Sequence, residues 1–128
     1  ATEKLAKAYL LAGPTDIQTV RTTHSAFTKY LQALSRNKRL QNALGMLDTQ
    51  LRAHIKQLLP LAYEIERLAP ALARDGPNPE YPWETPRGTY HAPAVYEFGM
   101  SSILLEPRGL HLKRLIQIAL ERFHFLHD

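Results

Sequence analysis

The chain has 128 residues, a formal net charge of +4 and a pI near 9.5, and it contains no cysteine. This length suits a single domain, residues 1–128, that buries a core without disulfides or metals. The absence of cysteine excludes thiol catalysis and thiolate metal sites. The longest apolar run near the N-terminus, Ala8 to Ala12, is too short for a secretory signal or a membrane span. We therefore expect a soluble, cytoplasmic protein.

The basic side chains are distributed unevenly along the chain. No acidic residue occurs between Ile17 and Leu47, whereas several acids lie between Glu64 and Glu106. The acid-free segment holds five cations and one histidine, namely Arg21, His24, Lys29, Arg36, Lys38 and Arg39. A local excess of positive charge attracts phosphate groups.

Two helices are predicted in the first third of the chain. The first covers Thr2 to Ala12, ends at Gly13-Pro14, and is followed by a loop that runs through Thr22. Its apolar face is Leu5, Ala8, Tyr9 and Ala12. The second covers Ser25 to Ser35 and can be capped by Thr22 or Thr23. Its inner face is Phe27, Tyr30, Leu31 and Leu34, and its outer face is Ser25, Lys29, Gln32 and Arg36.

The longest apolar stripe lies between Lys38 and Arg74. Its members recur at gaps of three and four residues, as on one side of a helix: Leu40, Leu44, Leu47, Leu51, Ile55, Leu58, Ala62, Ile65 and Leu68. Pro60 interrupts the stripe, which predicts two helices in series or one sharply kinked helix. Gly45 also weakens an unbroken helix. A stripe of this length requires partner helices, so the sequence predicts an all-α fold.

The segment from Asp75 to Phe98 is rich in proline and aromatic residues. It contains Pro77, Pro79, Pro82, Pro86 and Pro93, together with Tyr81, Trp83, Tyr90, Tyr96 and Phe98. We expect a long ordered loop that lies across the helices or across a partner subunit. A short strand or extended segment is predicted for Met100 to Leu105, and Pro107 then starts a final helix, Leu110 to Leu126.

No pattern of catalytic or metal-binding residues stands out. There is no Gly-x-Ser-x-Gly turn and no phosphate-cradling glycine loop, and only Asp128 accompanies the pair His124 and His127. We therefore expect neither a metal nor a cofactor. The better candidate is a phosphate-binding edge made by Arg21, His24, Lys29 and Arg36, and the alternative is that these cations form an ordinary solvated helix face. Tyr81 and Trp83 either stack on a base or pin their own loop to the core.

Three segments resemble the HEPN family of helical domains. The segment Ala1-Thr2-Glu3-Lys4-Leu5-Ala6-Lys7-Ala8-Tyr9-Leu10 is similar to the second-helix pattern of that family. Arg21-Thr22-Thr23-His24 resembles the Arg-Thr-His segment that opens the next helix, and Glu80-Tyr81-Pro82 resembles the Arg-Tyr-Pro turn after the long helix. The first family helix has no counterpart, and Glu80 replaces the usual arginine.

The resemblance implies an up-and-down bundle of four or five helices that forms a homodimer. Some relatives accompany small nucleotidyltransferases. This resemblance implies an accessory module that binds nucleotide, RNA or an acidic partner, and it favours a protein without enzymatic activity. Others are metal-independent ribonucleases of toxin–antitoxin systems, with an arginine, four to six residues and then a histidine.

Arg122 and His127 fit that ribonuclease spacing, although Phe123 stands where the nucleases favour a polar residue. On one ideal helix the two side chains would diverge by about 140°. A third alternative is a structural dimerisation protein whose aromatic loop reaches across the dimer.

Overall fold

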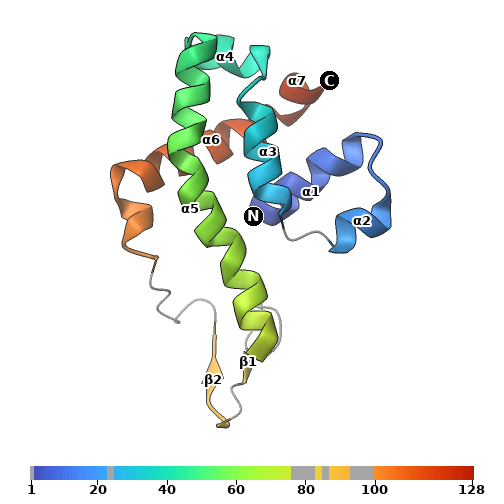
Figure 1. Ribbon diagram of the computed structural model, residues 1–128, viewed down its shortest axis with the longest axis vertical. Helices are drawn as coiled ribbons and strands as arrows, with labels where there is room; N and C mark the ends of the chain where they lie inside the picture. The colour runs from blue at the N-terminus through green and yellow to red at the C-terminus, as the bar shows by residue number, and fades with distance from the viewer. Residues whose placement is uncertain (1, 23–24, 76–82, 85–86, 93–99) are drawn as a thin grey trace.

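The computed structural model describes residues 2–22, 25–75, 83–84, 87–92 and 100–128, and the described chain is mainly helical (Figure 1). The α-helices are α1 (Thr2–Ala12), α2 (Ile17–Thr22), α3 (Ala26–Leu34), α4 (Lys38–Leu44), α5 (Asp48–Asp75), α6 (Pro107–Glu121) and α7 (Phe123–His127). A 3-10 helix, η1 (Ile103–Leu105), precedes α6. Strands β1 (Trp83–Glu84) and β2 (Tyr90–His91) pair antiparallel, with Trp83 opposite His91 and Glu84 opposite Tyr90. The expected all-α class is confirmed.

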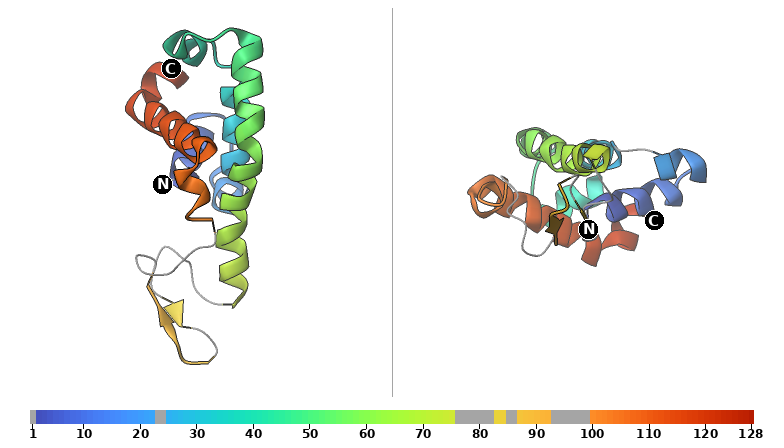
Figure 2. Two further views of the ribbon diagram at one scale, coloured as in Figure 1. Left: turned by 90° about the vertical axis from the view of Figure 1, so that its left-hand side faces the viewer. Right: turned by 90° about the horizontal axis from the view of Figure 1, so that it is seen from below.

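Helices α3 and α5 lie side by side, and α1, α4 and α6 pack against this pair, whereas α2 contacts α1 and α7 contacts α4 and α6. Helix α1 contacts α3 and α6 contacts α5, and both run across the long axis of the α3–α5 pair (Figures 1 and 2). The core is drawn from α1, α3, α4, α5, α6 and α7 and includes Leu5, Ala6, Phe27, Tyr30, Leu31, Leu34, Leu40, Leu51, Ile55, Leu58, Ala62, Leu112, Leu115, Ala119 and Leu126. Burial of these apolar surfaces is the main stabilising contribution to the fold.

The predicted helices over the first third of the chain are confirmed, with two corrections. Helix α1 has the expected bounds, but it buries Leu5 and Ala6 and leaves Ala8 and Ala12 exposed. Residues 17–22, predicted as loop, form helix α2 instead. The carboxylate of Asp16 starts α2, because it accepts hydrogen bonds from the backbone N–H groups of Gln18 (2.9 Å) and Thr19 (3.0 Å). These bonds and one from the Thr19 hydroxyl, which is the largest contribution, lower the pKa of Asp16.

A glutamate from α5 caps α3 at its N-terminus. Ser25 occupies the N-cap position but makes no side-chain cap hydrogen bond, and Thr22 belongs to α2, so the predicted threonine cap is wrong for Thr22. Thr23 lies outside the described residues. Glu66 accepts a hydrogen bond from the Thr28 backbone N–H (2.8 Å) and another from the Thr28 hydroxyl (2.9 Å). One carboxylate therefore satisfies a free helix N–H and ties α3 to α5.

The long apolar stripe breaks at Gly45 and not at Pro60. Gly45 adopts a left-handed conformation with φ of 64°, its N–H bonds the Asn42 carbonyl, and the N–H of Met46 bonds the Gln41 carbonyl. This pattern is a Schellman motif and ends α4. Pro60 lies exposed inside α5, and its neighbours Leu58 and Leu61 are buried. Packing of the buried face outweighs the hydrogen bond that proline removes. Leu47 is 69% exposed because it lies in the α4–α5 turn.

The C-terminal region contains two further differences from the predicted elements. The segment Met100 to Leu105 forms a turn and η1, not a strand. The final helix starts at Pro107, as predicted, but it does not continue unbroken to Leu126, because Arg122, with φ of −120° and ψ of 26°, separates α6 from α7. η1 packs closely on α6 at Gly109. A Cβ at this position would lie only 2.4 Å from the Ile103 carbonyl oxygen, so there is no room for a side chain.

The loop predicted between Asp75 and Phe98 lies mostly outside the described residues. Its described part is the β1–β2 pair, which lies beyond the C-terminal end of α5 (Figure 1). In the part of the chain that the structure describes, no helix is long and apolar enough to cross a bilayer.

Candidate functional site

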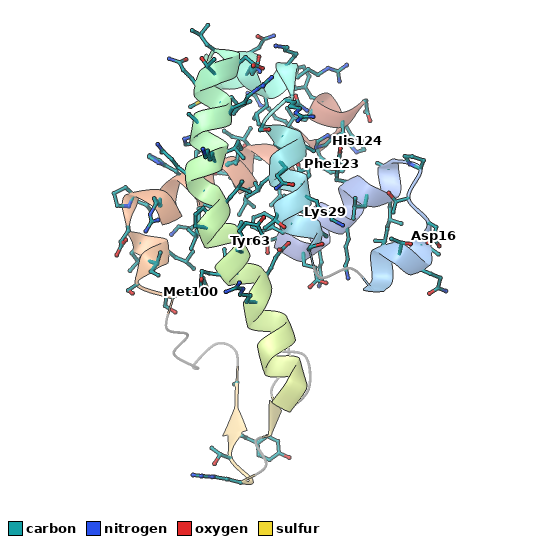
Figure 3. The ribbon with its side chains drawn as sticks, viewed as in Figure 1. Asp16, Lys29, Tyr63, Met100, Phe123 and His124 are labelled. Atoms are coloured by element: carbon teal, nitrogen blue, oxygen red, sulfur yellow. The ribbon has the colours of Figure 1, made fainter. Side chains whose placement is uncertain are left out.

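Two exposed cations, Lys29 on α3 and Arg36 in the turn that follows α3, form a surface that we call the α3 cationic face. They are seven residues apart, and the Arg36 N–H bonds the Ala33 carbonyl oxygen at 3.2 Å in the turn beyond the last helical residue, Leu34. Gln32 lies between them and is also exposed. Among the described residues, no carboxylate forms an ion pair with either cation. Figure 3 shows Lys29 beside α3. Both charges are therefore available to an external anion.

The side chains of the other two residues of the predicted phosphate-binding edge, Arg21 and His24, lie outside the described part of the structure. The backbone of Arg21 belongs to α2, but its side chain lies outside the described part of the structure, and His24 lies outside it altogether. The same holds for the side chain of Trp83 in β1 and for all of Tyr81. Of the predicted edge, the structure describes Lys29 and Arg36.

Further cations lie on α4, directly after the α3 cationic face in the sequence. The Lys38 ammonium is 3.5 Å from the carboxylate of Asp48, which also pairs with Arg52 at 2.9 Å. The Arg39 guanidinium donates a hydrogen bond to the Phe125 carbonyl oxygen (2.6 Å) and lies 5.7 Å from the centroid of the Phe125 ring. Asn37 donates to the Leu126 carbonyl oxygen at 2.9 Å. These contacts fix α7 against the start of α4.

His127 lies in a cluster of aromatic rings that joins α1, α3 and α7. Its Nε2 is 3.0 Å from the Tyr30 hydroxyl, and its ring centroid is 4.9 Å from that of Tyr9 and 4.8 Å from that of Phe123. Burial is the main cause of the lowered pKa of His127, and the nearby Asp128 opposes it. Burial, and then Tyr9, raise the pKa of Tyr30.

These two shifts mean that both partners of the hydrogen bond are uncharged at neutral pH. Tyr30 keeps its proton because its pKa is raised, and His127 is neutral because its pKa is lowered. In one histidine tautomer the tyrosine hydroxyl donates to Nε2, and in the other Nε2–H donates to the hydroxyl oxygen. A histidine held in this way positions α7, and its Nε2 is already occupied.

The structure does not bring Arg122 and His127 into one site. Arg122 is exposed and lines a hollow of ≈470 Å³ at the bend between α6 and α7. His127 instead lines a hollow of ≈260 Å³ beside Tyr9 and the C-terminal end of α1. Arg122 is also not helical, so the ideal-helix angle between the two side chains does not apply here.

A second pair of histidines comes from α5 and α6. The ring centroids of His54 and His111 are 5.5 Å apart. Burial, and then the proximity of His111, lower the pKa of His54. Within residues 2–22, 25–75, 83–84, 87–92 and 100–128, no group of three or more potential metal ligands occurs.

Two features of the site were not predicted from the sequence. Tyr30 and His127 are 97 positions apart, and Arg39 and Phe125 are 86 positions apart. Tyr30 was correctly placed on the inner face of its helix, but its spacing indicates burial and does not name a partner. These contacts depend on how α7 folds back onto α3 and α4, which no local pattern encodes.

Comparisons of the chain with protein-family models, with curated proteins and with solved structures gave no match.

Proposed function

We propose that this protein is a HEPN-like helical accessory module that binds RNA through phosphate contacts on its α3 cationic face. The observation that carries the proposal is the exposure of Lys29 and Arg36 without a carboxylate partner among the described residues. A cation on the helix and another in the turn at its end present two exposed positive charges to a phosphate backbone. Free nucleotide and an acidic protein partner are the alternatives that the same charges allow.

The resemblance to the HEPN family adds three expectations to this proposal. They are an up-and-down bundle of four or five helices, a homodimer, and a small nucleotidyltransferase as partner. The side-by-side packing of α3 and α5 supports the first expectation, although α1 and α6 run across that pair. Arg21 and His24 belong to the same proposed edge.

The ribonuclease alternative has less support from the geometry. It requires Arg122 and His127 at one scissile phosphate, and the two residues line different hollows. In addition, the Nε2 atom of His127 is already hydrogen-bonded to Tyr30. A general base must be within hydrogen-bond reach of the proton that it removes.

Fluorescence anisotropy with a labelled RNA oligonucleotide tests the proposal. The variant Lys29→Glu/Arg36→Glu should weaken binding at least tenfold, because two attractive contacts become repulsive ones. The matched control is Lys56→Glu/Arg67→Glu, which reverses two exposed cations on α5 and should change binding much less. Circular dichroism should show the same helicity in all three proteins. Equal affinity of the wild type and the α3 variant would refute the proposal.

A further inference from the structure

The bend between α6 and α7 exposes an aromatic ring that is held in place. Phe125 is 54% exposed, and nearby Leu120 is 52% exposed. Arg39 lies over the Phe125 ring and hydrogen-bonds to its carbonyl oxygen. The aromatic ring is therefore fixed on one side by a guanidinium and remains accessible to solvent. A rigid, accessible aromatic ring is a stacking platform.

The same bend forms a hollow of a size suited to a small ligand group. The hollow measures ≈470 Å³ and is lined by Leu120, Glu121, Arg122, Phe123, His124 and Phe125. Small-molecule sites commonly have volumes of about 300–1,000 Å³. The bend exists because Arg122 leaves the helical conformation between α6 and α7. Figure 3 labels Phe123 and His124 at this junction.

The charges around the hollow decide which part of a nucleic acid it fits. Arg122 contributes a positive charge and Glu121 a negative one, and His124 lies 3.6 Å from the Asp128 carboxylate. Glu121 in turn accepts a hydrogen bond from Gln117 at 2.8 Å. Because the charges nearly cancel, a phosphate gains little here. An uncharged ring with polar edges fits this combination of apolar wall, donor and acceptor better.

The hollow and the α3 cationic face lie close together. Arg36 and Arg39 are three residues apart, so their Cα atoms are separated by at most about 11 Å. Arg39 in turn contacts Phe125 directly. The Tyr30–His127 hydrogen bond also fastens α7 to α3, one residue from Lys29. A single strand can therefore reach both places at once.

We infer that the hollow at the α6–α7 bend takes an unpaired nucleobase of single-stranded RNA, stacked on Phe125, while the phosphates of the strand lie on the α3 cationic face. The inference rests on the proposed function for the phosphate contacts. It adds a preference for unpaired RNA, because a base in a duplex cannot leave its neighbours to stack on a side chain without an energetic cost.

Anisotropy titrations with a single-stranded RNA and a duplex RNA of equal phosphate number test this preference. The wild type should bind the single strand more tightly. Phe125→Ala should weaken single-strand binding roughly 5- to 150-fold and leave duplex binding unchanged, as expected for one lost base–aromatic stack. Phe125→Trp should retain the preference and Phe125→Leu should lose it, which separates stacking from folding. Tyr63→Ala, at an exposed aromatic residue on α5, is the matched control and should have no effect.

Three results would overturn the inference. The first is that the wild type binds both RNAs with equal affinity. The second is that Phe125→Ala weakens binding of both RNAs equally. The third is that light scattering shows a dimeric wild type and a monomeric Phe125→Ala variant. The last result would make a second copy of the chain the occupant of this surface. If Lys29→Glu/Arg36→Glu abolishes binding and Phe125→Ala changes nothing, only this inference fails. If Phe125→Ala alone weakens single-strand binding, the α3 proposal fails and the base site stands.

Discussion

Gly45 ends α4 and thereby separates it from α5. Its φ of 64° lies in the left-handed region, and no atom within 4 Å would meet an added Cβ. Gly45→Ala should therefore destabilise the fold by about 1 kcal/mol through backbone conformation alone. Urea unfolding measures this change. The control is Gly13→Ala, where the new Cβ would make an ordinary 3.6 Å contact and the backbone is not left-handed. Equal stability of the two variants would contradict the role given to Gly45.

Glu66 lies on α5 but also stabilises a second helix, α3. Its carboxylate receives two hydrogen bonds from Thr28, and one of them caps α3. Glu66→Ala should lower the free energy of unfolding by about 2 kcal/mol, because a free helix N–H and a buried hydroxyl both lose a charged acceptor. Glu64→Ala, on the exposed side of the same helix, should have little effect in the same urea titration. A loss of similar size in both variants would mean that the cap does not matter.

At the scale of elements, α7 is attached to α3 through His127, a histidine whose pKa is lowered by burial. The lowered pKa values of His127 and His54 mean that the folded protein resists protonation of both rings. Below about pH 6.5 the unfolded chain binds protons that the folded chain does not. Stability should therefore fall as pH falls from 7 towards the lowered pKa values, and it should change no further from this cause below them.

Melting temperatures between pH 7 and pH 5 measure this effect. The variant His54→Gln/His127→Gln should show a flatter profile than the wild type, because the two groups that titrate differently in the folded and unfolded states are gone. His124→Gln is the control, since the side chain of His124 is 89% exposed. An identical profile for the wild type and the double variant would contradict the assignment.

Helix existence could be predicted from the sequence where apolar spacing was regular and long. Helices α1 and α3 have close to the expected bounds, and the inner face of α3 is the predicted one. Helix α2 escaped prediction because a six-residue helix with one buried apolar residue, Val20, shows no periodicity. The break at Gly45 was signalled by the residue itself, whereas Pro60 was misleading because packing overrides its local preference.

Breaks within the C-terminal helix were not predictable in this way. Arginine is a good helix former, yet α6 ends at Arg122 and α7 turns back towards α3 and α4. The turn allows Leu126 to be buried and His127 to reach Tyr30. The hollow beside Phe125 is a consequence of this tertiary arrangement, and for that reason no local pattern of residues indicated it.

At the scale of the whole molecule, the proposed RNA surface depends on which side of α3 is left uncovered. Helices α1 and α5 pack on α3 and cover its apolar side, and this arrangement turns Lys29 and Arg36 outwards. The exposure of these two cations was predicted correctly from helical spacing. Their proximity to the α6–α7 bend was not, because it requires the path of the chain through α4 and back to α7.

The salt dependence of RNA affinity tests the phosphate contacts most directly. Each phosphate contact on a single strand contributes about 0.7 to the slope of log affinity against log salt concentration. Lys29→Gln/Arg36→Gln should therefore reduce the slope by about 1.4 relative to the wild type, with unchanged helicity. A slope that is the same in both proteins would contradict the claim that the α3 cationic face binds RNA phosphates.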